Sequence, residues 1–315
     1  MSILSRMKNM FTEKPKIIVV LGQTSTGKSD LAVDLPLKHN GEIISADSRQ
    51  VYRGMNIGSG KITKTEMKGV PHHLLDVADP NDIFSVHDFQ EKGTQILQNV
   101  LDRKKTPIIC GGTGFYIDAL VYQTQFSQVP ANLKLRAKLE KKSLPELQQL
   151  LKEKMDTRFR LGGRNNNKID MKNPVRIMRA LEIIDALGYI PKIKKQNSYN
   201  VLWIGLSLPK DVLDKRIHTR IVKRLENGML DEAHTLLSNG VSHDRLQSLG
   251  LEYRFMSKHI LGEINFDEMI DQLYRATVQF AKRQKTWFKR NKNIHWFDSV
   301  NERDGVFEAV ERFIK

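Results

Sequence analysis

The residues with the clearest chemistry form a phosphate-binding pattern, Gly22-Gln23-Thr24-Ser25-Thr26-Gly27-Lys28-Ser29. This segment matches G-x-x-x-x-G-K-[ST], in which glycines let the backbone turn its amide hydrogens inward. Those amides and the start of the following helix create an anion site. Lys28 would add a positive charge to the phosphates, and Ser29 would offer a hydroxyl to Mg²⁺ bridging their oxygens. The pattern therefore predicts binding of a phosphate or diphosphate together with Mg²⁺.

A second group of residues separates the possible reactions. A nucleoside triphosphatase with this loop needs an acidic residue at the end of a neighbouring strand, to hold the water shell of the metal. The apolar run 107–110 ends instead in Gly111-Gly112-Thr113-Gly114, and the acidic candidate is Asp47, after another apolar run. A carboxylate in that place suits contact with a substrate. The pattern favours a transferase that acts on a diphosphate over a motor ATPase.

The elements that must position these residues alternate along the chain. Short β-branched or apolar runs predict strands at 16–21, 42–45, 72–77, 107–110, 201–206 and 294–297. Helical patterns follow at 29–38 and begin at Ser85, Gly114 and Pro209. Ser85 and Asp88 form a capping box at one of these starts. Alternating strands and helices predict an α/β fold of the P-loop type, with a mostly parallel sheet flanked by helices.

The alternation stops between 123 and 199, where we expect an all-helical insertion. Leucines at helical spacing predict a helix from Leu133 to Met155, and glycines and asparagines at 158–168 predict a loop. Asn173-Pro174 is an N-cap followed by a first-turn proline, and predicts a helix that ends near Gly188. We expect the P-loop core to comprise 15–122 and 200–315, with basic helices in the C-terminal segment.

Composition bounds the partners and the location. Fifty-one Lys and Arg against 36 Asp and Glu give a net charge of +15, which favours a polyanion such as nucleic acid. A lone cysteine, Cys110, excludes an internal disulfide, and His72 and His73 would point to opposite faces of a strand. There is no apolar run of about 18 residues, and residues 1–14 lack an apolar signal segment. We expect a cytoplasmic protein without a membrane partner, and a monomer by default.

Further segments, taken with the loop, resemble one family, the tRNA dimethylallyltransferases (tRNA isopentenyltransferases). They are Ala46–Gly58, Pro71–Val77, Gly111–Tyr116, Asn173–Glu182 and Ala281–Phe288. The resemblance runs in order from about Lys16 to Phe297. It implies transfer of a dimethylallyl group from dimethylallyl diphosphate to the exocyclic amine of the adenine adjacent to the anticodon of tRNA, with release of diphosphate.

The resemblance also implies roles for individual residues. The loop from Gly22 to Ser29 would hold the leaving diphosphate and, through Ser29, Mg²⁺. Asp47 would act as the general base for the amine, and Thr113 would donate a hydrogen bond to a diphosphate oxygen. An arginine of the helix after Pro209 would clamp the diphosphate. Arg220 and Arg224 lie one helical turn apart, and Arg224 is the favoured candidate.

The tRNA contacts implied by the resemblance are spread along the chain. The adenine would flip out of the anticodon stack to reach a buried diphosphate. The expected tRNA-binding residues are Asp47, Ser48, Arg49, Gln50, Arg136, Arg176, Arg179, Lys282 and Arg283. The last two belong to a basic, aromatic segment without acidic residues, 272–297, which suits RNA phosphates.

Two alternatives remain open from the residues alone. A P-loop kinase of small molecules would use the same loop for ATP, but would need neither the insertion nor the basic C-terminal segment. An RNA-binding protein with an inactive loop would not need Asp47 and Thr113.

Overall fold

The computed structural model describes residues 14–159 and 169–315. The loop expected at 158–168 therefore falls almost wholly outside the described residues. The core of the fold is a six-stranded sheet of order β3-β2-β4-β1-β5-β6, in which every pairing is parallel. Its strands are β1 (Lys16–Gly22), β2 (Gly41–Ser45), β3 (His72–His73), β4 (Thr106–Gly111), β5 (Asn200–Ser207) and β6 (Ile294–Asp298). The predicted fold class is confirmed.

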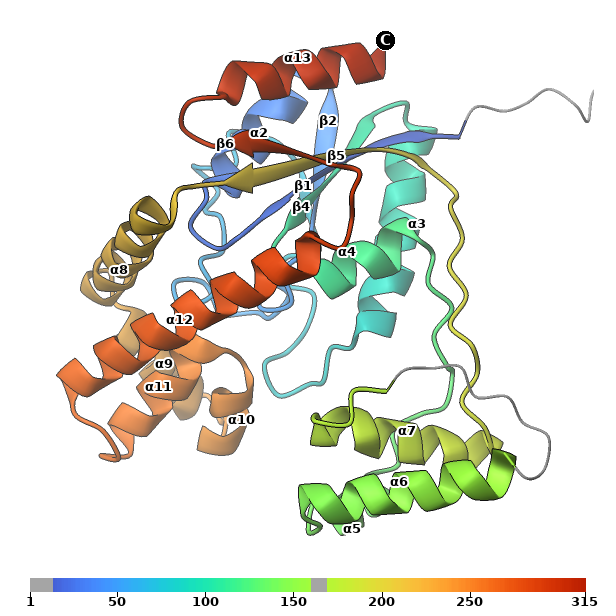
Figure 1. The fold of residues 1–315 in the computed structure, drawn as a ribbon. Helices are drawn as coiled ribbons and strands as arrows, with labels where there is room; N and C mark the ends of the chain where they lie inside the picture. The colour runs from blue at the N-terminus through green and yellow to red at the C-terminus, as the bar shows by residue number, and fades with distance from the viewer. Residues whose placement is uncertain (1–13, 160–168) are drawn as a thin grey trace, which may run out of the picture. The chain divides into compact units, whose positions relative to one another are not determined.

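Helices cover both faces of the sheet (Figure 1). On one face, Ile18 and Val20 of β1 pack with α2 (Lys28–His39) and α13 (Arg303–Ile314). On the other face, Ile17 and Val19 pack with α3 (Val86–Asp102) and α4 (Gly114–Val121). The side-chain alternation of a strand buried on both faces explains why β1 reads as a continuous apolar run. The capping box of Ser85 and Asp88 is present at the start of α3.

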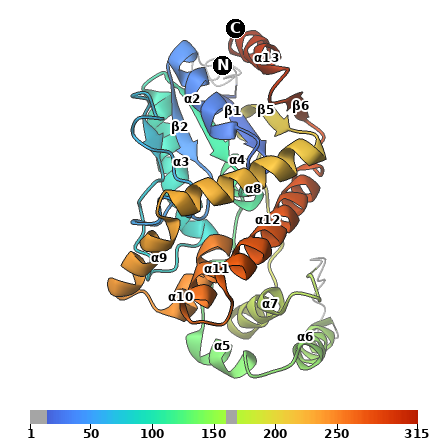
Figure 2. The same cartoon turned by 90° about the vertical axis from the view of Figure 1, so that its left-hand side faces the viewer.

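The C-terminal helices build a second core beside the sheet. They are α8 (Lys210–Glu226), α9 (Met229–Ser238), α10 (His243–Ser248), α11 (Leu251–Ile260) and α12 (Phe266–Phe288). Their buried faces enclose Val51, Tyr52 and Met55, from the segment that follows β2. Helices α8 and α12 lie side by side near the carboxyl ends of the strands (Figures 1 and 2). This packing brings the C-terminal segment to the phosphate-binding loop.

Two predicted elements differ from the structure. The strand expected at 72–77 is only His72–His73, because Leu74 and Asp76 adopt positive φ angles of 64° and 56° and leave the extended conformation. The helix expected from Leu133 to Met155 is two helices, α5 (Leu133–Leu139) and α6 (Leu144–Phe159). Ser143 and Glu146 bond to each other at the break, with Glu146 Oε2 accepting from the backbone N–H of Ser143 at 2.7 Å. These bonds cap the start of α6, so a second helix begins there in place of one continuous helix.

The chain divides into two compact units, Thr124–Gln196 and the remainder. The smaller unit contains α5, α6 and α7 (Pro174–Leu187) around a core of its own. Asn173 caps α7 and Gly188 ends it with a left-handed φ of 80°, as the sequence predicts. Among the described residues, no helix is both long and apolar enough to cross a membrane.

Candidate active site at the carboxyl ends of the strands

A large cleft lies where β1, β2 and β4 end. Parallel strands deliver their carboxyl ends to one edge, so the segments after them meet there. The cleft has a volume of about 1460 Å³, and its lining includes Lys28, Asp47, Thr113 and Arg220. Typical small-molecule pockets are roughly 300–1000 Å³, so this one has room for more than a small diphosphate. Every residue lining it belongs to the larger unit.

The phosphate-binding loop joins β1 to α2 as the motif predicts. Gly22 has a φ of 154°, and a Cβ there would lie 2.4 Å from the carbonyl oxygen of Leu206. Gly27 adopts a left-handed conformation at the start of α2. Inside the loop, the Thr26 hydroxyl donates to the carbonyl of Gln23 at 2.8 Å. Ser25 also has a positive φ of 64°, and its buried Oγ has no hydrogen-bond partner among the described residues. A strained, unpartnered hydroxyl of this kind suits a polar ligand.

Lys28 is one of several cationic side chains that line the cleft. Its Nζ donates to the carbonyl of Gln23 at 2.6 Å, so the lysine folds back over the loop. Burial, together with the charge of Arg220, lowers the pKa of Lys28 to about 8, while Cys110 and Asp47 oppose the shift. An anion bound beside Lys28 would favour its charged form.

Asp47 and Thr113, which are 66 positions apart in the chain, meet at adjacent strand ends. The backbone N–H of Ser48 donates to Thr113 Oγ1 at 3.1 Å. The backbone N–H of Thr113 donates to the carbonyl of Ala46 at 3.2 Å. Asp47 Oδ1 accepts from the N–H of Arg49 at 2.9 Å, which fixes the rotamer of the carboxylate. The structure thus brings together a carboxylate and a hydroxyl beside the phosphate-binding loop.

The two arginines of α8 have different surroundings. Arg224 Nη1 donates to the carbonyl of Gly58 at 3.2 Å and lies 3.5 Å from the Glu252 carboxylate. Arg220 Nε is buried without a hydrogen-bond partner among the described residues. Burial lowers the pKa of Arg220 to about 10, with a further contribution from Arg224, while Asp47 opposes the shift. Both arginines line the cleft, and Arg220 offers a buried donor that no described residue occupies. The choice between Arg220 and the favoured Arg224 as the diphosphate clamp stays a prediction.

Two glutamines join helix α12 to the loop: Gln23 of the loop itself, and Gln284 of α12, which the sequence reasoning did not single out. Gln284 accepts from the backbone N–H of Thr24 at 2.8 Å and donates to the carbonyl of Gly112 at 2.9 Å. Gln23 is buried and donates to the carbonyl of Ala281 at 3.1 Å. Gln284 falls within the segment Ala281–Phe288 that carries the resemblance. Its partners are distant in the chain, so the sequence alone does not indicate its contacts. Together the two glutamines join α12 to the turns after β1 and β4.

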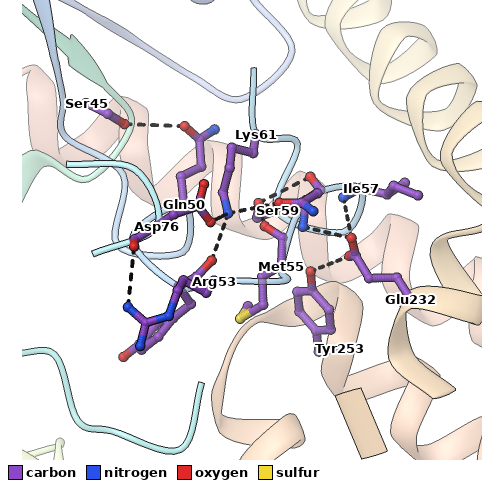
Figure 3. A network of polar contacts seen from close by, with 12 residues as sticks. Ser45, Gln50, Arg53, Met55, Ile57, Ser59, Lys61, Asp76, Glu232 and Tyr253 are labelled. Atoms are coloured by element: carbon purple, nitrogen blue, oxygen red, sulfur yellow. Dashed lines mark hydrogen bonds and ion pairs between the residues drawn. The ribbon is translucent and has the colours of Figure 1, made fainter. Parts of the chain in front are cut away.

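The expected tRNA contacts near Asp47 line the cleft. Ser48, Arg49 and Gln50 all contribute to its wall. Gln50 is held on both sides: its Oε1 accepts from Ser45 Oγ at 3.3 Å (Figure 3), and its Nε2 donates to the carbonyl of Gly60 at 3.0 Å. Arg283 of α12 also lines the cleft, whereas Lys282 is exposed elsewhere on the helix. These positions allow contact with a large substrate that enters the cleft.

The expected tRNA contacts in the smaller unit are tied to carboxylates. Glu182 is fully buried and accepts from Arg136 Nε at 2.7 Å and from Arg179 Nη1 at 3.1 Å. Those hydrogen bonds overcome burial and hold the pKa of Glu182 below its usual value. Arg176 forms an exposed ion pair with Asp170 at 3.4 Å. Glu182 therefore holds Arg136 and Arg179 in place, while Arg176 is more exposed.

Few protein groups are available to a metal ion. No cluster of three or more His, Cys, Asp or Glu with metal-binding spacing occurs within the described ranges. Ser29 is exposed and lines the cleft together with Asp47. This small set of oxygen donors fits Mg²⁺, which keeps several waters and takes its other ligands from substrate phosphates. His72 instead bonds to the Val70 carbonyl and His73 to the Glu42 carboxylate, each at 2.8 Å.

Comparison with known proteins places this site in a family. The model of the IPP transferase family matches residues 50–291. "tRNA dimethylallyltransferase 2" of Treponema denticola is 42% identical over 295 residues, which cover 90% of this chain and 96% of that protein. The protein of the same name from Shewanella sediminis is 42% identical over 91% of this chain and 94% of its own.

Solved structures agree with these relatives. The full-length tRNA isopentenylpyrophosphate transferase of Bacillus halodurans is 34% identical and superposes with a TM-score of 0.70, covering 96% of this chain and 98% of that one. A eukaryotic dimethylallyltransferase whose structure was described as acting on tRNA has a TM-score of 0.74 at 24% identity, a likeness of fold. The family match and the extent of identity show that this chain belongs to the IPP transferase family.

Proposed function

We propose that this enzyme transfers a dimethylallyl group from dimethylallyl diphosphate to the exocyclic amine of the adenine adjacent to the anticodon in tRNA. A carbon–nitrogen bond forms at the amine, the carbon–oxygen bond to the diphosphate breaks, and diphosphate leaves. The observation that carries the proposal is the meeting of Asp47 and Thr113 beside the phosphate-binding loop, with the Ser48 N–H bound to Thr113 Oγ1 at 3.1 Å. The relatives bear names for this activity.

The diphosphate would bind where positive charge and unpartnered donors gather. The loop amides, Lys28 and the buried Nε of Arg220 would neutralise the charge that develops on the leaving group. The Thr113 hydroxyl would donate to a diphosphate oxygen once the donor is bound. Mg²⁺ held by Ser29 and the phosphates would supply further charge neutralisation.

Asp47 would accept the proton that the amine loses as the new bond forms. Its hydrogen bond from the Arg49 N–H, at 2.9 Å, orients the carboxylate. The adenine would leave the anticodon stack and enter the cleft against Ser48, Arg49 and Gln50. The positive charge of the chain, the arginines of the smaller unit and Lys282 and Arg283 would attract tRNA phosphates.

The test is incorporation of labelled dimethylallyl diphosphate into unmodified tRNA in the presence of Mg²⁺. We expect label in wild-type reactions, and none when the adenine beside the anticodon is replaced by another base. Asp47→Asn keeps the shape of the side chain but cannot accept the proton, so turnover should fall by about two to four decades. Label that enters RNA irrespective of this adenine would contradict the proposed acceptor.

The small-molecule kinase alternative finds no support among the relatives, whose names describe prenyl transfer. We expect the enzyme to act as a monomer. A tRNA substrate is consistent with the expected cytoplasmic location.

A further inference from the structure

A carboxylate outside the cleft holds one segment of the cleft wall. The segment Asn56–Gly60 follows Gln50 in the chain and supplies Asn56, Ile57, Ser59 and Gly60 to the lining of the cleft. Glu232 of α9, which does not line the cleft, accepts the backbone N–H groups of Asn56, Ile57 and Gly58 at 2.8, 2.8 and 2.9 Å. Figure 3 shows this carboxylate facing the segment. Three successive amides directed at one anion fix the backbone more strongly than a single hydrogen bond does.

Tyr253 of α11 completes the environment of Glu232. Its hydroxyl donates to Glu232 Oε1 at 2.7 Å (Figure 3). Burial and the Glu232 charge raise the pKa of Tyr253 well above its usual value, so the hydroxyl remains a donor. The ring lies directly beneath the segment, where a Cβ on Gly58 would approach Tyr253 Cζ to 2.7 Å. The Glu232 carboxylate and the Tyr253 ring therefore fix the position of the segment relative to α9 and α11.

The segment in turn holds two side chains of the cleft. Its Gly58 carbonyl accepts from Arg224 Nη1 at 3.2 Å, and its Gly60 carbonyl accepts from Gln50 Nε2 at 3.0 Å. Gly60 also leaves room for Arg224, because a Cβ there would fall 1.6 Å from Arg224 Nη2. Movement of the segment would therefore displace Arg224 and Gln50 together. Neither the phosphate-binding loop nor Thr113 is among the partners of these carbonyls.

We infer that Glu232 is a positioning residue for the transfer step: it fixes the Asn56–Gly60 segment so that Gln50 and Arg224 hold the acceptor nucleotide against the bound diphosphate. This inference rests on the proposed function. The role differs from a general contribution to stability, because the effect must appear in the rate constant of correctly folded enzyme and not only in the amount of folded enzyme. It also differs from a role in binding the diphosphate, which the loop would hold independently.

The experiment compares Glu232→Gln with Asp231→Asn in single-turnover reactions, with excess enzyme and limiting labelled donor. Glu232→Gln keeps the size of the side chain but replaces one acceptor oxygen with an NH₂ group facing the amides. We expect the first-order rate constant to fall about tenfold or more, while the final yield of labelled tRNA and the affinity for inorganic diphosphate stay within about twofold. Asp231→Asn removes an exposed charge from the same first turn and should leave all three unchanged.

Two further variants keep the test decisive if Glu232→Gln is poorly folded. Glu232→Asp retains the carboxylate and should recover part of the rate constant. Gly58→Ala leaves Glu232 in place but should lift the segment from the Tyr253 ring, and we expect the same slow transfer. A wild-type rate constant in Glu232→Gln, or a loss of yield with an unchanged rate constant, overturns the inference. Failure of the wild-type enzyme to label tRNA would instead reject the proposed function.

Discussion

Lys28 shows how burial alters the chemistry of a single side chain. Exposed lysines are fully charged near neutrality, whereas burial lowers the pKa of Lys28 to about 8. The nearby positive charge of Arg220 adds to this shift, and Asp47 opposes it. The lysine can therefore lose its proton at mildly alkaline pH when no anion is bound beside it. A bound diphosphate would oppose that loss, so ligand binding and protonation are linked.

This linkage predicts a pH dependence of diphosphate binding. Because the anion prefers protonated Lys28, affinity should be greatest below pH 8 and should weaken by up to about tenfold per unit as the pH rises above it. Titration calorimetry with inorganic diphosphate from pH 7 to 9.5 measures the change. Lys28→Arg provides the control, since arginine stays charged and the titration of the ligand itself is common to both proteins. Identical pH profiles would show that another group titrates.

A second prediction at this scale separates Arg220 from Arg224. Arg220 has a buried Nε without a partner in the described chain, whereas Arg224 already binds Gly58 and Glu252. We therefore expect Arg220→Lys to weaken diphosphate binding about tenfold or more, and Arg224→Lys to change it less than threefold. Competition of inorganic diphosphate against labelled donor gives both affinities. The reverse order would restore Arg224 as the clamp.

Helix α12 shows what one element can do on two faces. Its buried face supplies Gln284 and the Ala281 carbonyl to the phosphate-binding loop. Its exposed face carries Lys282 and Lys285, which occupy a segment without acidic residues. The aromatic residues of this segment also divide: Phe288 is buried at 3% exposure, and Phe280 is exposed at 36%. The buried stripe fixes the helix, so the charges beside it keep a defined place.

Charge reversal on α12 tests its exposed face. If Lys282 and Lys285 each contact a tRNA phosphate, the double variant Lys282→Glu/Lys285→Glu should weaken binding and reduce the salt slope by about two. Filter binding of tRNA over a series of salt concentrations measures both quantities. Lys92→Glu on α3, an exposed lysine elsewhere in the fold, should change the slope by less than one. An unchanged slope in the double variant would place the RNA on another surface.

At the scale of the whole molecule, the diphosphate site and the helical insertion are built independently. The lining of the cleft lies entirely within the larger unit, and Thr124–Gln196 has a separate hydrophobic core around Leu147, Leu151 and Ile177. The two ends of the insertion leave the larger unit near each other, because Gln123 Nε2 donates to the Tyr199 hydroxyl at 3.4 Å. The insertion can therefore be removed without changing the lining residues.

Replacing Thr124–Gln196 with a short Gly/Ser linker should separate the two substrates. We expect diphosphate affinity to remain within about threefold, while tRNA affinity falls at least tenfold because the arginines and other basic groups of the insertion are lost. Calorimetry with inorganic diphosphate and filter binding with tRNA measure the two affinities. Retained tRNA affinity would mean that the larger unit alone recognises the RNA.

The sequence by itself determined the phosphate-binding loop, the parallel α/β sheet and the positions of Asp47 and Thr113 at strand ends. These features depend on local patterns: apolar runs, glycines that permit unusual φ angles, and residues placed directly after strands. Local patterns also predicted the ends of α7, where Asn173 and Gly188 cap the helix.

Only the tertiary structure decided which side chains act together. Arg220 and Arg224 share a helix face, but Gly58 and Glu252 bind Arg224. Gln284 and Glu232 acquire their contacts from residues about 170 positions or more away in sequence. Such contacts arise from packing between distant elements, which leaves no periodic or spaced pattern in the chain.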